Sequence, residues 1–171
     1  METSTASVED NPYAISPFVA GKFYYAIVIA QVDGKDIIAN EDSSDIFYDF
    51  PYLATVGFKT YNTTNAKNMS RMFYNSSVLT SIPGLKSFDT SNVTNFSQMF
   101  RFCTSMSSID VSSFNTSKAT NMSSMFERCD DITSLNISNF DTRAITDASA
   151  LNKFAYNCRY LTDITFGPNF G

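Results

Sequence analysis

The chain has 171 residues, of which 17% are charged, with a net charge of −5 and no histidine. This length is enough for one domain with a sizeable core. The acidic balance argues against nucleic acid as a partner, because no basic stripe is present to neutralise phosphates. The absence of histidine removes the commonest acid–base residue and the commonest metal ligand.

Residues 1–16 are polar and punctuated by proline, and we expect a flexible N-terminal lead-in there. No basic region followed by an apolar core is present at the start, so no signal peptide is visible. The apolar run from Phe18 to Val32 is interrupted by Gly21 and Lys22 and is too short to span a bilayer. We therefore expect no membrane insertion by this chain.

Residues 17–45 predict a β-hairpin that caps the N-terminal end. Two β-rich runs within 22–39 are joined by Asp33-Gly34, and Asp-Gly between such runs is a strong hairpin signal. A repeat array needs a cover of this kind over its first unit. The alternative is a separate ligand-binding module. The acidic residues that follow fit a solvated loop better than a calcium site, because their spacing matches no EF-hand loop: Glu41, Asp42, Asp45 and Asp49.

Residues 46–171 contain one degenerate and four clear copies of a repeat. The clear copies begin at Tyr61, Phe88, Phe114 and Phe140, and the last three starts are 26 residues apart. Repetition at a fixed period is typical of an architecture in which each unit stacks on its neighbours.

Two periodicities alternate inside each copy. From Val93 to Cys103, apolar residues recur at intervals of three, three, one and three, which indicates one face of a short helix or 3₁₀ turn. Ile109 and Val111 alternate with polar residues, which indicates a short strand. The predicted fold class is an α/β repeat solenoid that is leucine-rich-repeat-like, with the β-hairpin as its N-terminal cap.

The run CDDITSLNI at residues 129–137 carries a leucine-rich-repeat strand pattern. The whole unit, FDTSxVTNMSxMFxxCxxLTxLNIS, resembles the BspA-like leucine-rich repeats of bacterial surface proteins. The resemblance covers about Tyr61 to Phe166. It implies a cell-surface or secreted protein that serves in adhesion or protein–protein contact, with no catalytic residue and no cofactor to carry over.

The three cysteines occupy one repeat position, at Cys103, Cys129 and Cys158, where the first clear copy has Ser76. A column of buried thiols is the favoured interpretation, and an intermolecular disulfide is the alternative. A straight ladder presents sulfurs in a row and not as a tetrahedron, so we predict no metal site.

The candidate binding residues are the outward positions of the predicted strands, which would form an exposed and slightly acidic face. This face suits a protein or glycan ligand on a host or neighbouring cell surface. The six residues are Ser108, Asp110, Ser134, Asn136, Asp163 and Thr165.

We therefore predict a non-enzymatic, surface-exposed interaction module for adhesion or for protein or glycan binding. One alternative is a phage or prophage tail-associated receptor-binding module, which lysis releases without an export signal. Another is a structural spacer. An enzyme is disfavoured because no nucleophile elbow or phosphate-binding loop is present, and because Cys103 lacks a base.

Overall fold

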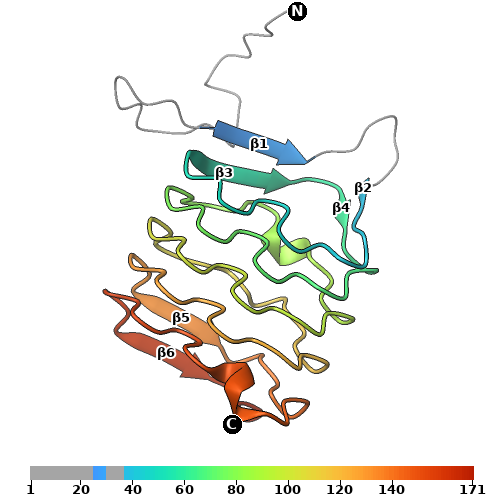
Figure 1. Cartoon of the computed structure of the whole chain (residues 1–171), viewed down its shortest axis with the longest axis vertical. Helices are drawn as coiled ribbons and strands as arrows, with labels where there is room; N and C mark the ends of the chain where they lie inside the picture. Colours follow the sequence, from blue (N-terminus) through green and yellow to red (C-terminus); the bar gives the residue numbers. More distant parts are fainter. Residues whose placement is uncertain (1–24, 30–36) are drawn as a thin grey trace, which may run out of the picture.

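The structure is a stack of backbone rungs. The computed structural model describes residues 25–29 and 37–171, and the chain descends from β1 at one end to β6 at the other (Figure 1). We number rungs 1 to 5 as residues 42–67, 68–94, 95–120, 121–149 and 150–171, from their contacts. Parallel bridges join the first residues of rungs 1 to 4: Asp42, Asn68, Asn95 and Asn121.

The strands are short, and all of their pairings are parallel. β1 (Tyr25–Ile29) pairs with β3 (Leu53–Phe58), β2 (Ile37–Ile38) with β4 (Tyr61–Asn62), and β5 (Ser134–Ile137) with β6 (Asp163–Phe166). The described residues contain two 3₁₀ helices, η2 (Leu85–Ser87) and η3 (Ala148–Leu151), and no α-helix.

The segments predicted as short helices are runs of turns. In rung 3 the local backbone bonds span three residues, as from the Met99 N–H to the Phe96 carbonyl and from Cys103 to Phe100, both at 3.1 Å. Gln98 and Phe102 have φ values of 59° and 63°, which are left-handed and break an α-helix. Every second N–H of this segment donates instead to a carbonyl of rung 4. The donors are the N–H groups of Phe96, Gln98, Phe100 and Phe102.

The predicted fold class, an α/β repeat solenoid of leucine-rich-repeat type, is therefore wrong. Small parallel strand pairs and turns make up the described residues. The spacing of three, three, one and three brings apolar side chains to one face in a helix and also in successive three-residue turns. Here the N–H groups bond to the next rung, so they cannot also form the i to i−4 bonds of a helix.

The predicted β-hairpin cap is also wrong. β1 and β2 do not pair with each other. Each pairs instead with a later strand, in the registers Ile27 to Val56 and Ile37 to Tyr61. The Asp33-Gly34 turn and the lead-in at residues 1–16 lie outside the described residues. Strand-forming composition indicates a strand but does not say which strand it pairs with.

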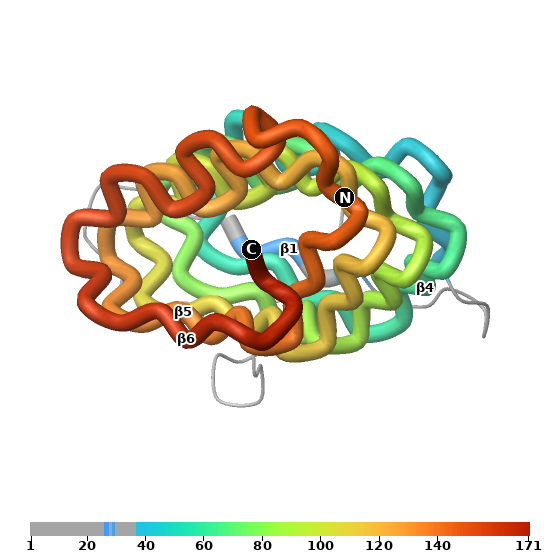
Figure 2. The backbone as a smooth tube through the Cα atoms, turned by 90° about the horizontal axis from the view of Figure 1, so that it is seen from below, coloured from blue at the N-terminus to red at the C-terminus, as the bar shows by residue number. Residues whose placement is uncertain are grey.

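A column of phenylalanine rings runs through the core. Seen along the stack, the rungs superimpose as flattened loops (Figure 2). Rung 5 has Ala155 at the position that phenylalanine occupies in rungs 1 to 4. The neighbouring Phe154 packs edge-on against the Phe126 ring of rung 4, with 5.3 Å between the ring centroids. Stacked rings contribute about 0.5–1.5 kcal/mol per pair beyond their buried area. The rings of rungs 1 to 4 stack nearly parallel at 5.4, 5.5 and 5.6 Å: Phe47, Phe73, Phe100 and Phe126.

Buried threonines tie each rung to the next. The Thr90 hydroxyl donates to the Asn115 carbonyl at 3.1 Å and accepts from the Asn115 N–H at 2.7 Å. Thr116 makes the same two bonds with Asp141, at 3.0 and 2.7 Å. Each hydroxyl thus satisfies two backbone groups of the following rung. The members of this column are at most 4% exposed: Thr63, Thr90, Thr116 and Thr142.

Replacing Thr90 with valine tests this column. Valine keeps the shape but removes the hydroxyl, so we expect the free energy of unfolding in urea to fall by about 1–3 kcal/mol. The matched control is Thr120→Val, whose exposed hydroxyl donates to the Thr94 carbonyl at 3.2 Å and can be replaced by water. We expect the control to change stability by less than about 0.5 kcal/mol. Equal losses would contradict a special role for the buried hydroxyls.

Candidate functional site

All six predicted binding residues are exposed, and the structure brings four of them together. Ser134 on β5 is the register partner of Asp163 on β6, and Asn136 is the partner of Thr165. The other two, Ser108 and Asp110, lie on residues 106–111 of rung 3, which form no strand.

Residues 106–111, which we call the open segment, interrupt the ladder of strands. Rungs 1 and 2 are joined by bonds from the Val56 N–H to the Ser81 carbonyl and from Phe58 to Pro83, at 3.4 and 2.8 Å. Further along the stack, β5 pairs with β6. Between them, the N–H groups of 107–111 and the carbonyls of 106–110 bond to no described residue. Such groups bond to water or to a ligand.

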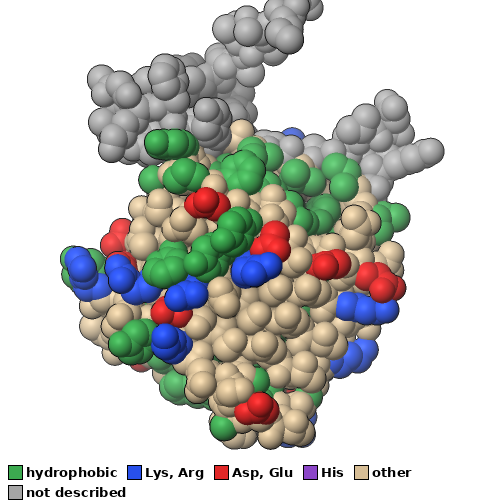
Figure 3. Space-filling view, in the orientation of Figure 1, with side chains coloured by type: hydrophobic (Ala, Val, Ile, Leu, Met, Phe, Trp, Pro, Cys, Tyr) green, Lys and Arg blue, Asp and Glu red, His purple; other side chains and the backbone are tan. Residues whose placement is uncertain are grey.

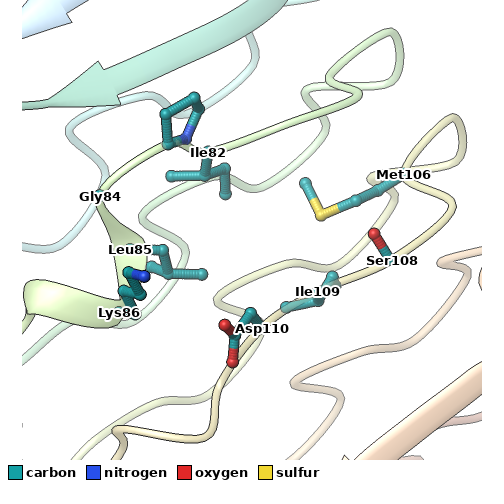
Figure 4. A pocket seen from close by; sticks show the side chains of 9 residues that line it. Ile82, Gly84, Leu85, Lys86, Met106, Ser108, Ile109 and Asp110 are labelled. Carbon is teal, nitrogen blue, oxygen red and sulfur yellow. The ribbon is translucent and has the colours of Figure 1, made fainter.

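A groove of about 270 Å³ lies between the open segment and rung 2. Lys86 and Asp110 lie toward one end of it, and Met106 and Ser108 toward the other (Figure 4). Its walls expose polar and apolar surface in similar amounts, and the apolar side chains include Ile82, Leu85, Met106 and Ile109.

Pro83 and Gly84 divert rung 2 beside this groove. Proline has no N–H to donate to a ladder. Gly84 has a φ of 88°, and a Cβ at this position would lie 2.1 Å from the Phe58 carbonyl oxygen. Glycine thus allows the close approach to β3, and η2 begins at the next residue. The chain leaves the strand direction here, opposite the open segment.

Asp110 supplies a fixed negative charge at the groove. Its carboxylate accepts from the Ser112 hydroxyl at 2.6 Å and from the Ser112 N–H at 3.1 Å. These two bonds, with the Lys86 charge as a lesser cause, lower the pKa of Asp110, so the group is ionised at neutral pH. Asn136 accepts from the Ser138 N–H in the same way, at 3.1 Å.

A second surface feature was not predicted from the sequence. The Tyr48 and Tyr74 rings stack at 4.9 Å, and Phe102 meets Tyr74 edge-on at 5.7 Å. The guanidinium carbons of nearby arginines lie over these rings, 4.7–6.0 Å from the ring centroids. Aligning the two positions that follow the phenylalanine column would have revealed all of its members except Arg71, which lies two positions before Phe73. We call this set the aromatic–arginine stripe: Tyr48, Arg71, Tyr74, Arg101, Phe102 and Arg128.

Acidic partners hold the stripe in place. Arg71 makes a two-bond pair with Asp45 at 2.8 and 2.7 Å. Arg101 pairs with Glu127, which is 5% exposed, through a hydrogen bond of 3.3 Å and an ionic contact of 2.9 Å. The shorter contact lacks hydrogen-bond geometry and leaves the Arg101 Nε and the Glu127 Oε2 atoms without a hydrogen bond. Rung-to-rung ion pairs thus fix Arg71 and Arg101, whereas Arg128 pairs with Asp130 of its own rung at 3.1 Å.

The acidic residues near the start of rung 1 are not gathered around one point. Asp42 accepts from the Asn68 side chain at 3.0 Å, Asp45 binds Arg71, and Asp49 accepts from the Asn75 side chain at 2.7 Å. Each carboxylate therefore serves its own contact with rung 2. No group of three metal-ligating side chains is present within 25–29 and 37–171.

The cysteine column donates to the core backbone. Cys103 and Cys129 are buried free thiols, as the buried-column interpretation predicted, and Cys158 is half-buried. They donate to the carbonyls of Phe73, Phe100 and Phe126, at 3.2, 3.1 and 3.0 Å. Ser76 makes the same bond to Phe47 at 3.0 Å. Burial raises the pKa of Cys103 and of Cys129 far above the usual range, so these thiols stay protonated.

Charges on the surface are mixed in sign. On the face shown in Figure 3, Lys and Arg side chains lie beside Asp and Glu side chains, and uncharged groups fill much of the area between them. Within the described part of the chain, no helix is long and apolar enough to cross a membrane.

Comparison with protein families gives a match over residues 41–163 to the family described as a Mycoplasma protein of unknown function, DUF285. Neither the curated proteins nor the solved structures gave a match.

The buried thiols predict a loss of stability at alkaline pH. In the unfolded chain a thiol ionises at about pH 8.5, whereas the raised pKa keeps it neutral in the folded chain. The thiols therefore stabilise the fold fully below that pH, and the free energy of unfolding should fall above it by about 1.4 kcal/mol per pH unit per buried thiol. Urea titrations across this range should show a shallower fall for the variant with both Cys103→Ser and Cys129→Ser. An unchanged slope would contradict this origin.

Gly84→Ala should destabilise the chain by more than about 1 kcal/mol, the cost of the left-handed conformation alone, because the new Cβ also meets the Phe58 oxygen. The control is Gly171→Ala, where φ is 137° and nothing lies within 4 Å. Thermal unfolding compares the two variants. A Gly84→Ala variant as stable as the control would show that rung 2 does not depend on this close approach.

Proposed function

The chain belongs to the Mycoplasma family DUF285, whose function is unknown, and on this premise we propose that it is a non-enzymatic interaction module. It binds a protein or glycan ligand on a host or neighbouring cell surface. The observation that carries the proposal is the open segment, whose N–H and carbonyl groups at residues 107–110 bond to no described residue.

The chemistry of the groove supports this class of ligand. Peptide backbone and sugar hydroxyls both offer donors and acceptors that match a row of free N–H and carbonyl groups. Asp110 adds an ionised acceptor, and charge-assisted hydrogen bonds are stronger than neutral ones. Ile82 and Ile109 offer apolar surface for a side chain or for the face of a sugar ring.

The size of the groove limits what it holds. Its volume of about 270 Å³ lies just below the range of about 300–1,000 Å³ that is typical of drug-sized ligands. It therefore accommodates one side chain or one sugar ring, and the rest of a ligand lies along β5 and β6. There Asn136 and Thr165 are neighbours across the strand pair, and they extend the polar strip.

Two further points support the location and the class. The resemblance of residues 61–166 to BspA-like repeats favours a cell-surface or secreted protein. The sequence contains no histidine, and the buried, protonated Cys103 thiol is unsuited to act as a nucleophile. Binding without chemistry is the function that these residues support best.

A binding screen of the purified chain against host-cell surfaces, extracellular-matrix proteins and a glycan array tests the proposal. The test variant changes Asp110, Asn136 and Thr165 to lysine together. We expect binding by the unmodified chain and a loss of at least about tenfold in the variant, because it removes acceptors and reverses the charge at the groove.

The matched control changes Thr94, Thr120 and Thr146 to lysine, in an exposed column where rung 1 already has Lys67. This variant should bind as the unmodified chain does. Binding that survives the strand-face variant would place the site elsewhere. A chain that binds nothing in the screen would contradict the proposal and favour a spacer.

A further inference from the structure

The groove beside the open segment has a charged end and an apolar stretch. Lys86 and Asp110 lie toward one end, Met106 and Ser108 lie toward the other, and the Ile109 side chain lies between them (Figure 4). Long charged side chains place their methylene groups along apolar surface and keep the charged head in a polar environment. The groove therefore fits a side chain with an apolar stem and a charged head better than a wholly apolar one.

Asp110 has one carboxylate oxygen left for a ligand. The Ser112 hydroxyl and the Ser112 N–H both donate to its Oδ1 atom, at 2.6 and 3.1 Å. Among the described residues, none donates to its Oδ2 atom. The Asp110 side chain is exposed, and the two bonds from Ser112 hold the carboxylate in one orientation. The charged end of the groove thus presents an oriented anionic acceptor.

The backbone of the open segment adds neutral acceptors. The carbonyls of residues 106–110 accept from no described residue. A lysine ammonium has three N–H donors and no acceptor, so it can use the Asp110 Oδ2 atom and still donate to a carbonyl or to water. An arginine guanidinium binds best when both carboxylate oxygens are available, and Ser112 already occupies one of them. The site therefore favours an ammonium over a guanidinium.

Lys86 opposes a bound cation less than Asp110 attracts it. No ion pair involves Lys86 in the part of the chain that the structure describes. Its exposed ammonium lies on a flexible four-carbon stem and can turn toward solvent, whereas Ser112 holds the Asp110 carboxylate. The net charge of −5 also attracts cations. The fixed charge at this end of the groove is therefore negative.

We infer that the groove binds the side chain of a lysine in an extended peptide, with the ammonium at Asp110 and the methylene groups beside Ile109. This inference rests on the proposed function, because it names the ligand of the same site. The volume of about 270 Å³ holds one such side chain. The free N–H and carbonyl groups of the open segment then bond to the peptide backbone on either side of the lysine.

A display selection of random heptapeptides on the purified full chain tests the inference, with the glycan array run in parallel. We expect lysine at one fixed position of the selected peptides. Fluorescence anisotropy then compares each selected peptide with forms that carry norleucine or arginine there. Norleucine keeps the stem and loses the charge, so the dissociation constant should rise about fivefold, the upper range for an exposed ion pair. Arginine should also bind more weakly than lysine.

Two single variants of the chain test the two charges separately. Asp110→Asn keeps an acceptor for Ser112, so it should weaken the lysine peptide about fivefold and leave the norleucine peptide unchanged. Lys86→Gln removes a like charge and should strengthen the lysine peptide about twofold. The matched controls are Asp131→Asn and Lys118→Gln, at exposed positions outside the groove. Both controls should bind the lysine peptide as the unmodified chain does.

The outcomes separate this inference from the proposed function. Selected peptides that lack lysine overturn the inference, as do lysine peptides that bind Asp110→Asn and the unmodified chain equally. A weaker lysine peptide with Lys86→Gln also overturns it, because the groove would then hold an anion. Glycans that bind while no peptide is selected overturn the inference and leave an interaction module. A chain that binds neither peptide nor glycan contradicts both.

Discussion

The rung-to-rung backbone hydrogen bond is the interaction on which the structure depends. In each turn segment, every second N–H donates to a carbonyl of the following rung, and the N–H groups between them close three-residue turns. A rung alone has no partner for half of its donors, so it is stable only between neighbours. This arrangement also gives the stack a direction, because the donors of the turn segments face the C-terminal end and the acceptors face the N-terminal end.

The composition follows from this constraint. Equivalent side chains lie one rung apart, so a column of like charges would repel, while rings, hydroxyls and amides gain from stacking. The phenylalanine rings and the buried threonines are of this kind. Asparagine begins rungs 2 to 4, where Asn68, Asn95 and Asn121 each accept from the N–H two residues further on, at 3.0 Å. This local bond stabilises the first turn of each rung.

The proposed binding surface lies where the regular bonding stops. At Pro83-Gly84 the strand direction changes, and the open segment of rung 3 is left with free N–H and carbonyl groups beside a groove. There the remaining backbone groups determine the kind of ligand that fits. The open segment suits a ligand with both donors and acceptors.

The sequence by itself determined which residues share a column, because a constant period places equivalent residues one above another. Phe73, Phe100 and Phe126 stack as aligned, and the aligned cysteines donate to successive carbonyls of the core. The outward character of Ser134 and Asn136 could also be read from their alternation with Leu135 and Ile137. The tertiary structure decided between helix and turns, because the apolar spacing fits both and only the partner of each N–H separates them. It also decided that β1 pairs with β3 and not with β2, and that the ladder opens at residues 106–111. Those outcomes depend on contacts between rungs, which local residue patterns do not encode.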